Sequence, residues 1–409
     1  MAAHNPGDIL IDDLTINSPR SGSWQAAGNF LSFDIFESMF APAVLGTIEV
    51  LDDKDYLGTL KITGDETVSL SFRNPNGTSV SYQFHLNQVQ DVGIEGAMKS
   101  KTYKLEVVSR EALTGQGNQV QKAYNTTIDQ IVADLHKNFH NSQLPIFTEP
   151  TKGNRKFVVP NQPSYHAIEN LRKEAVSAQN KGSNYMFWQT WRGFYFQSLE
   201  YMLQQGDVKT FKQDNTIGHY LGNVVDNNIL AWQVKQNMDA MNRIHAGVIN
   251  QRVTTYDPHT HKYVSNDFKI QQNELTNLGA GLITTLSSFL SLFPNANRTV
   301  HRVVNPNQAI NVGKSFVPAS IPYKQLNMAA MQEQMMQMTA IGDPTLEPGK
   351  TITANVPKIT GETGTTQSEP QVSGRWLISK VHHEVRRPQV RPRWVSNLEC
   401  LKGAYQEGV

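Results

Sequence analysis

Two stretches near the C-terminus carry the pattern that decides the fold: RWLISKV at residues 375–381 and WVSNLECL at residues 394–401. Successive side chains of a β-strand point to opposite faces, so Trp394, Leu398 and Cys400 share one face of the second stretch. The opposite face carries Val395, Asn397, Glu399 and Leu401. The second stretch is therefore expected to be a strand whose apolar face packs on a core.

The first stretch has the same character if one β-bulge interrupts it. Trp376, Ile378 and Val381 then share a face. An Arg- and Pro-rich link at residues 386–393 joins the two stretches, which predicts a hairpin with a basic tip. A further strand is expected at residues 351–356, after a turn-rich segment. Together these strands predict the closing part of a β domain.

The beginning of the chain alternates in the same way. Apolar and polar residues take turns at residues 31–35, 68–72, 80–86 and 103–107. The segment Asn74-Pro75-Asn76-Gly77 separates the second and third of these runs, as a hairpin turn does. We expect an antiparallel β-barrel or sandwich over residues 1–115.

The period then changes to that of helices. Apolar residues recur at helical spacing over residues 128–139 and again over residues 168–178. An aromatic hairpin follows at Tyr185–Phe196. Aromatic hairpins can stack the bases of single-stranded nucleic acid, but no run of Lys or Arg flanks this one, which favours a packed sheet. Residues 116–222 are expected to form a small α+β domain.

Strands return after residue 223, at Ile229–Val234, Arg243–Tyr256 and His261–Val264. Residues 223–265 and 341–409 are expected to form a second barrel. Residues 266–340 are expected to be an insertion with helices. One is the uncharged amphipathic segment Thr276–Phe293, which packs on its own protein or a partner. Another follows Pro322 and carries methionines at spacings of three and four, Met328, Met331, Met335 and Met338.

The predicted fold class is therefore α+β and mainly β. Two antiparallel tube-like β-barrels flank an α+β domain, and a partly helical segment is inserted in the second barrel. A chain of 409 residues is long enough for several such domains.

Composition excludes several classes of protein. The net charge is +1, which argues against a general nucleic-acid binder with a large basic field. A single cysteine excludes a disulfide framework and a cysteine-rich metal site. The start of the chain lacks the basic and apolar runs of a signal peptide, and we expect a soluble protein.

The charges are unevenly distributed along the chain. Residues 1–70 hold eleven acids and three bases, whereas residues 375–393 hold six bases and one acid, Glu384. Such segments are either solvated faces or complementary contacts between copies or with a neighbouring ring. Both readings remain open from the sequence.

The C-terminal pattern resembles the central hub proteins of contractile injection machines. The resemblance rests on the turn Gly342–Gly349, the run from Trp376 through His382-His383-Glu384, and the closing strand that ends near Gly403. The helix at Ser164–Val176 and the aromatic hairpin after it also look like the T-even-type tail hub. Late-control tail proteins and the VgrG spike proteins of type VI secretion are related to this family.

This resemblance implies a structural protein of the virion tail baseplate, assembled in the cytoplasm of a host bacterium. Two barrels per chain in a homotrimer would give a ring with pseudo-sixfold symmetry that joins a sixfold tail tube to a threefold central spike. The implied partners are the tube protein and the spike protein, with tape-measure and baseplate wedge proteins as further candidates. DNA would pass through the lumen without specific binding. Residues 266–340 have no counterpart in this resemblance.

No residue set in the sequence predicts a catalytic, metal or cofactor site. His259 and His261 lie in a turn with no third ligand at suitable spacing. His382 and His383 precede Glu384, but adjacent strand residues point to opposite faces and would not converge on one ion.

Cys400 lies in mid-strand among apolar neighbours, unlike an activated thiol. No distinctive pair of carboxylates suggests a glycosidase. We therefore expect no enzymatic activity. The alternatives are a tail-associated enzyme that degrades peptidoglycan, and another tail ring protein such as a distal-tail or tube-initiator ring.

Overall fold

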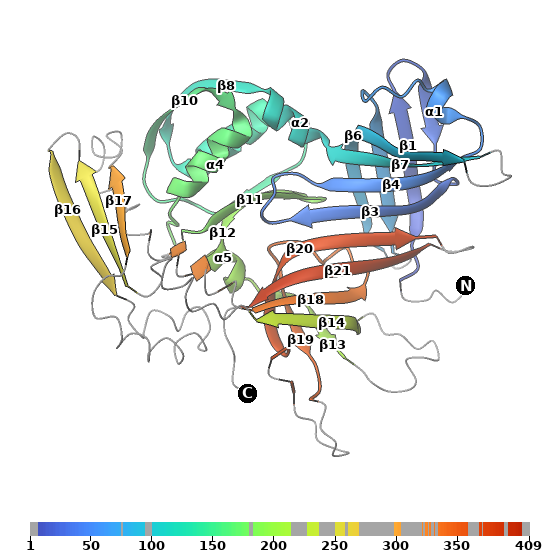
Figure 1. Cartoon of the computed structure of the whole chain (residues 1–409). Coiled ribbons are helices and arrows are strands. Elements are labelled where there is room, and N and C mark those ends of the chain that lie inside the picture. The colour runs from blue at the N-terminus through green and yellow to red at the C-terminus, as the bar shows by residue number, and fades with distance from the viewer. Residues whose placement is uncertain are drawn as a thin grey trace.

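The computed structural model describes residues 7–74, 77–94, 100–179, 183–213, 227–236, 250–257, 261–269, 298–303, 321, 324–325, 327–328, 331, 334–358, 368–369, 371–387 and 392–402. The fold is α+β and mainly β, as the sequence predicts. Several antiparallel sheets and a few short helices make up the described part of the chain (Figure 1).

One continuous sheet of thirteen strands runs through the molecule. Its main path passes, in spatial order, through β14 (Ile229–Gln236), β18 (Gln334–Ile341), β21 (Arg393–Lys402), β20 (Gly374–Arg386), β3 (Phe30–Ser38), β4 (Leu45–Asp52), β7 (Lys101–Ser109), β6 (Ser79–Ile94), β5 (Thr67–Arg73), β1 (Leu10–Ser18) and β2 (Gly22–Gln25). Two more strands branch from β20: β19 (Thr351–Asn355) and, beside it, β13 (Asp207–Lys212). The first and last thirds of the chain thus share one sheet.

The strands β1 to β7, here called the first barrel, surround a single core. Alternate residues of these strands are buried, because one face of each strand turns inward. The largest of the inward side chains are Trp24, Phe33, Phe72, Phe84 and Tyr103. A short helix, α1 (Tyr56–Thr59), lies in the connection between β4 and β5.

The strands β13, β14 and β18 to β21, here called the second barrel, surround another core. The path from β14 through β18, β21, β20 and β19 reaches β13. An isolated bridge between Lys212 and Asn228 then links the end of β13 to the start of β14. This bridge brings the strands back to their starting point, so that they enclose an apolar cluster that includes Trp376.

The C-terminal hairpin forms as its alternation predicts. Strands β20 and β21 pair antiparallel, with a register shift between Ile378 and Lys380 that supplies the expected bulge. Trp376, Ile378 and Val381 consequently enter one core, together with Leu398 and Cys400. The far end of the hairpin behaves differently, because Val385 and Trp394 pack in the core of the first barrel.

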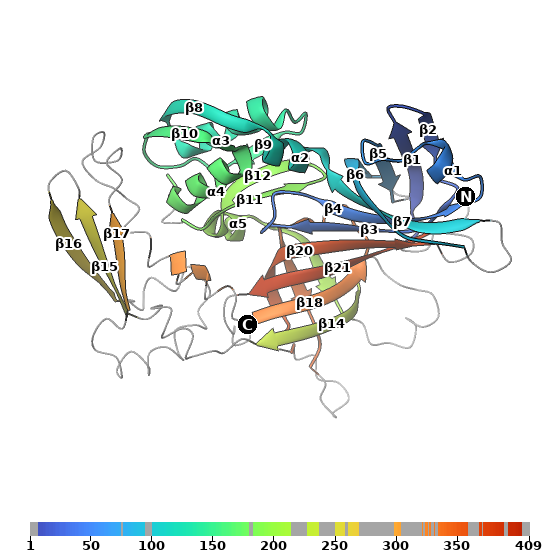
Figure 2. The same cartoon turned by 45° about the horizontal axis from the view of Figure 1, so that its top comes forward.

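The two barrels meet by direct strand pairing. Strand β20 pairs antiparallel with β3, from Lys380 opposite Ser38 to Arg386 opposite Ser32. Figures 1 and 2 show β20 and β3 side by side in both views, at the border between the two barrels.

Between the barrels in sequence lies a group of short elements, here called the α+β unit. It contains α2 (Arg110–Gly117), β8 (Gln119–Thr126), α3 (Ile128–Leu135), the π-helical turn η1 (His136–His140), β9 (Ile146–Thr148), β10 (Arg155–Pro163), α4 (Ser164–Glu174), β11 (Tyr185–Thr190), β12 (Gly193–Ser198) and α5 (Leu199–Gln204). The aromatic hairpin β11–β12 is fully buried, since helices and the barrels cover both its faces. A packed sheet is therefore the correct interpretation of that hairpin.

The methionine helix predicted after Pro322 is wrong in its second half. Met335 and Met338 lie in strand β18, which pairs with β14 on one side and β21 on the other. Met336 and Met338 enter the core of the second barrel, while Met328 and Met331 pack beside the α+β unit. Tertiary pairing overrides a helical spacing that only a few methionines supported. Residues 334–340 therefore belong to the second barrel and not to an insertion.

The strands predicted after residue 243 also have different partners from those expected. Strand β15 (Asn250–Asp257) pairs with β16 (Lys262–Lys269) and with β17 (Arg298–Val303) in a separate three-stranded sheet. This sheet stands apart from the second barrel in Figures 1 and 2. The predicted helix at Thr276–Phe293 lies outside the described residues. Among the described residues, no helix is long and apolar enough to cross a membrane.

A glycine at the border of the two barrels offers a test of this packing. Gly342 donates its amide to the carbonyl of Trp394 over 3.0 Å, and a Cβ atom at Gly342 would overlap the Trp394 ring. We expect Gly342→Ala to lower the free energy of unfolding by about 1–3 kcal/mol, the usual cost of overpacking a core. Urea unfolding followed by circular dichroism would measure it.

The matched control is Gly206→Ala. A Cβ atom at Gly206 meets no other atom within 4 Å, so this change should alter the free energy of unfolding by less than about 0.5 kcal/mol. Equal stabilities of the two variants would contradict the packing described for Trp394.

Candidate functional site

The candidate site is the outer face of the sheet that both barrels share. Eight neighbouring strands, β14, β18, β21, β20, β3, β4, β7 and β6, cross the border between the barrels without a break. Their inward side chains fill the two cores, so the alternate side chains lie together on the other side of the sheet. We call this side the open face.

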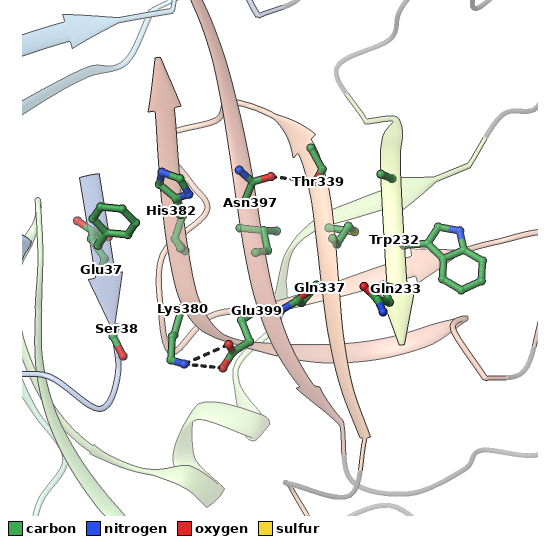
Figure 3. A pocket seen from close by; sticks show the side chains of 15 residues that line it. Glu37, Ser38, Trp232, Gln233, Gln337, Thr339, Lys380, His382, Asn397 and Glu399 are labelled. Atoms are coloured by element: carbon green, nitrogen blue, oxygen red, sulfur yellow. Dashed lines mark hydrogen bonds and ion pairs between the residues drawn. The ribbon is translucent and has the colours of Figure 1, made fainter. Parts of the chain in front are cut away.

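Figure 3 shows the part of the open face that spans β3 and the second barrel. A hollow of about 620 Å³ lies there, over β14, β18, β21, β20 and the end of β3. Its polar lining includes Gln233, Gln337, Thr339, Lys380, His382, Asn397 and Glu399. A second hollow, of about 640 Å³, lies over β3, β4 and β7 and is more apolar, with Phe36, Leu45 and Leu113 exposed in it.

Charges on the open face are largely paired with each other. Lys380 contacts Glu399 at 3.0 Å, and Lys104 contacts Asp91 at 2.8 Å. Uncharged residues are paired too, since the Thr339 hydroxyl donates to Asn397 over 2.8 Å. Paired and half-exposed charges leave little net electrostatic potential over this face. The face is therefore compatible with solvent and does not favour tight binding of a phosphate backbone.

The densest network lies on the border between the barrels. Asp34 on β3 stands directly opposite Glu384 on β20, a pair of like charges that would repel each other if left alone. Arg386 bridges them, with Nη1 at 2.8 Å from Asp34 and Nε at 3.1 Å from Glu384. His382 adds a contact of 2.8 Å from its Nε2 atom to Asp34, and the Asn397 amide donates to Glu384 over 3.2 Å.

The network changes the ionisation of Asp34. Burial alone would raise the pKa of this carboxyl, but the hydrogen bonds from His382 and Arg386 outweigh burial and hold the pKa below its usual value. Asp34 is therefore charged at neutral pH and holds the two barrels together through Arg386.

The same network is the only group of three potential metal ligands found among the described residues. One ligand atom each from Asp34, His382 and Glu384 lies within 4.8 Å of the others. An ion bound there would have to displace Arg386, which already contacts both carboxylates. The geometry is therefore that of an ion-pair network.

Sequence reasoning missed part of this cluster. His382 and His383 do point to opposite faces, since His383 is buried against Trp394 and Ser396. His382 and Glu384 share the open face, two residues apart, and meet Asp34 from a strand almost 350 residues earlier. An acidic residue on the polar side of β3 was visible in the sequence, but its partner strand was not.

The remaining candidates from the sequence do not come together. Cys400 is buried in the core of the second barrel, and burial raises the pKa of its thiol, which disfavours the reactive thiolate. The Nδ1 atom of His261 lies 2.9 Å from the Tyr256 hydroxyl in the separate three-stranded sheet. His259 lies outside the described residues.

Both ends of the open face finish at strand edges. Within the described residues, β14 pairs only with β18 and with the single bridge to β13. At the other end, the second half of β6 pairs with β7 alone, because β5 covers only the first half. Large apolar side chains are exposed on these edge strands: Leu230 on β14, and Val92 and Ile94 on β6. Exposed edges of this kind are potential pairing sites for another chain.

Comparison with known proteins supplies relatives in structure only. No protein-family model matches the sequence, and no curated protein matches it. Among solved structures, a tail protein from Neisseria meningitidis MC58 is similar with a TM-score of 0.58 and 11% identity, over 95% of this chain and 96% of that one. The 43 kDa tail protein of prophage MuSo2 from Shewanella oneidensis is similar with a TM-score of 0.54 and 10% identity, over 96% and 98% of the two chains. At these identities the likeness establishes the fold.

The ion-pair network predicts a pH-dependent contribution to stability. Asp34→Asn should lower the free energy of unfolding by about 1–3 kcal/mol at pH 7, because it removes the partly buried carboxylate that Arg386 and His382 contact across the border between the barrels. The pKa of Asp34 is lowered in the folded state, so its contribution is present above about pH 4 and is lost as the pH falls through the folded pKa. The difference between the variants should therefore shrink in acid.

Urea unfolding at pH 7 and pH 3 measures both effects. Glu106→Gln, on the same face two strands away, serves as the control and should stay within about 0.5 kcal/mol of the wild type at both values. A loss in Asp34→Asn that is the same at pH 3 as at pH 7 would contradict the proposed role of the charge.

Proposed function

We propose that this chain is a structural subunit of a phage tail baseplate, the hub at its centre, and that it acts as a homotrimer. The observation that carries the proposal is the open face: one sheet surface that runs across two barrels and whose outermost strands, β14 and the second half of β6, have no further strand ladder on their outer side among the described residues. The shared fold with two phage tail proteins supports it.

A ring follows naturally from these two edges. The β14 edge of one copy can lie beside the β6 edge of the next, an arrangement in which different surfaces meet and the ring closes by rotation. Three copies would supply six barrels, and their open faces would line a common channel. The two barrels of one chain are joined through β3 and β20, so the same kind of junction would recur around the ring.

Such a ring resolves a mismatch of symmetry. A sixfold tube requires six similar contacts, whereas a threefold spike requires three, and two barrels per chain satisfy both. We propose the tail tube protein and the central spike protein as the two partners, with tape-measure and baseplate wedge proteins as further contacts. The subunit would assemble in the host bacterial cytoplasm and reside in the tail of the virion.

The channel surface suits passage of DNA without specific binding. A lumen that bound phosphates tightly would slow ejection of the genome, and paired charges on the open face avoid this. We propose no catalytic role for this chain, in keeping with a buried Cys400 and with an ion-pair network already filled by Arg386.

We also propose a division of the chain along these lines. The first barrel takes residues 1–109 and the α+β unit residues 110–206, which moves both boundaries from those expected from the sequence. The second barrel takes residues 207–236 and 334–402, since β13, β14 and β18 belong to it. The sheet of β15, β16 and β17 would be a separate peripheral element.

Oligomeric state tests the ring. Sedimentation or light scattering of the purified full chain, alone and mixed with its tube and spike proteins, should show a trimer. Leu230→Glu or Ile94→Glu should raise the dissociation constant of that trimer by about tenfold or more, because an unpaired charge would be buried at the edge.

Val158→Glu is the matched control. Val158 is as exposed as these residues but lies on β10, away from both edges, and its substitution should leave the trimer intact. A chain that stays monomeric with its partners present would overturn the proposal. Electron microscopy of the particle measures its symmetry directly. We expect threefold symmetry with two barrels in each subunit.

A further inference from the structure

The tip of the aromatic hairpin, residues Thr190 to Gly193, is inserted where the two barrels meet. The amide of Trp191 donates to Glu37 of the first barrel over 2.9 Å. Its indole Nε1 donates to the carbonyl of Pro344, in the connection between β18 and β19 of the second barrel, over 3.2 Å. A few residues earlier, the indole of Trp188 donates to Pro348 over 3.1 Å. The aromatic hairpin is thus hydrogen-bonded both to β3 of the first barrel and to the β18–β19 connection of the second barrel.

Glu37 is an unusual residue in this junction. It follows Phe33 and Ile35 at the inward spacing of β3, where an apolar side chain is the rule, and it is only 1% exposed. Its Oε1 atom accepts bonds from the Tyr82 hydroxyl at 3.0 Å and from the Trp191 amide. Its Oε2 atom is buried and has no hydrogen-bond partner among the described residues.

A second buried carboxyl, Glu347, lies on the other side of the same turn and is also 1% exposed. It forms an ion pair with Arg192 and accepts bonds from the Thr190 and Tyr195 hydroxyls, each over 3.3 Å. Lys350 is a further positive charge near it. Glu347 therefore has counter-charges, whereas Glu37 has none among the residues that the structure describes.

The two carboxyls affect each other's ionisation. Burial, and then the charge of Glu347, raise the pKa of Glu37 to about 8, against the opposing effect of the bonds from Tyr82 and Trp191. Burial also raises the pKa of Glu347, while Arg192 and Lys350 act to lower it. The charge of Glu37 also contributes to raising the pKa of Tyr82, after burial. Glu37 accordingly holds its proton at neutral pH.

We propose that Glu37 is the proton-controlled latch of an interdomain clasp. With Glu37 protonated, the turn at Thr190–Gly193 closes on both barrels. Loss of that proton places a second negative charge beside Glu347 in a buried junction, and the turn is released. This inference goes beyond the proposed function, because it concerns the single chain and holds whether or not a ring forms.

The direction of the effect follows from linkage. A carboxyl whose pKa is about 8 in the closed state and about 4.5 when released favours closure fully below pH 4.5. That preference is lost as the pH rises towards 8. The equilibrium constant for opening should therefore increase roughly tenfold per pH unit between about pH 5 and pH 8, and then level off.

Hydrogen exchange of the Trp191 amide reports this opening directly, since that amide donates to Glu37. In the full-length chain, its protection factor, corrected for the intrinsic exchange rate, should fall about tenfold per pH unit from pH 6 to pH 8. Amides of Tyr103 and Leu105, in the core-forming part of β7, should keep constant protection and exclude global unfolding.

Glu37→Gln decides the matter. Gln keeps an acceptor oxygen for Tyr82 and Trp191 but cannot ionise, so protection of the Trp191 amide should become independent of pH. Glu66→Gln is the control, because Glu66 is an equally buried carboxyl of the first barrel. Its two oxygens accept hydrogen bonds from the backbone amides of Thr63 and Gly64. It should leave the pH dependence of the Trp191 amide unchanged.

Tyr82→Phe provides a second, independent variant. It removes a hydrogen bond that lowers the pKa of Glu37 in the closed state, so the fall in protection should begin at the same pH but level off at a higher pH than in the wild type. The proposal is overturned if Glu37→Gln retains the pH dependence of the wild type, or if Tyr82→Phe moves the levelling-off to lower pH. The oligomeric state is measured separately, so failure of the clasp and failure of the ring are distinguishable.

Discussion

The pairing of β3 with β20 is the interaction on which the rest of the structure depends. Seven residue pairs, from Lys380–Ser38 to Arg386–Ser32, join strands from the two ends of the chain. Backbone hydrogen bonds of this kind fix direction and register, so they convert two barrels into one continuous sheet. The open face, the network around Asp34 and the site of the interdomain clasp all lie on or beside this junction.

The two barrels are coupled through their cores as well as their strands. Val385 and Trp394 lie on the C-terminal hairpin but pack in the core of the first barrel, next to Phe72. At the other end of the same hairpin, Trp376 and Leu398 pack in the core of the second barrel. A change at either end of this hairpin therefore affects both barrels, and relative motion of the barrels would break core contacts.

The acidic side chains on the two sides of the junction differ in whether they have a positively charged partner. On the open face, Asp34 and Glu384 are partly exposed and share Arg386, so each acid has a counter-charge at hydrogen-bond distance. On the buried side, Glu37 has only hydrogen-bond donors and lies near Glu347. Coulomb interactions are less screened at buried positions, so the buried side responds to ionisation of Glu37, whose pKa is raised to about 8, whereas the open face responds only to protonation of Asp34 in acid.

The sequence by itself determined the local patterns. The bulged strand with Trp376, Ile378 and Val381, the strand with Leu398 and Cys400, and the first-barrel strands all follow from alternation, because one buried face imposes a period of two. Only the tertiary structure decided which strands pair. It placed Met335 and Met338 in a strand, gave β15 and β16 a sheet of their own, and brought Asp34 to His382 and Glu37 to Trp191. Contacts between residues so far apart depend on the register of whole sheets, and no local pattern encodes that register.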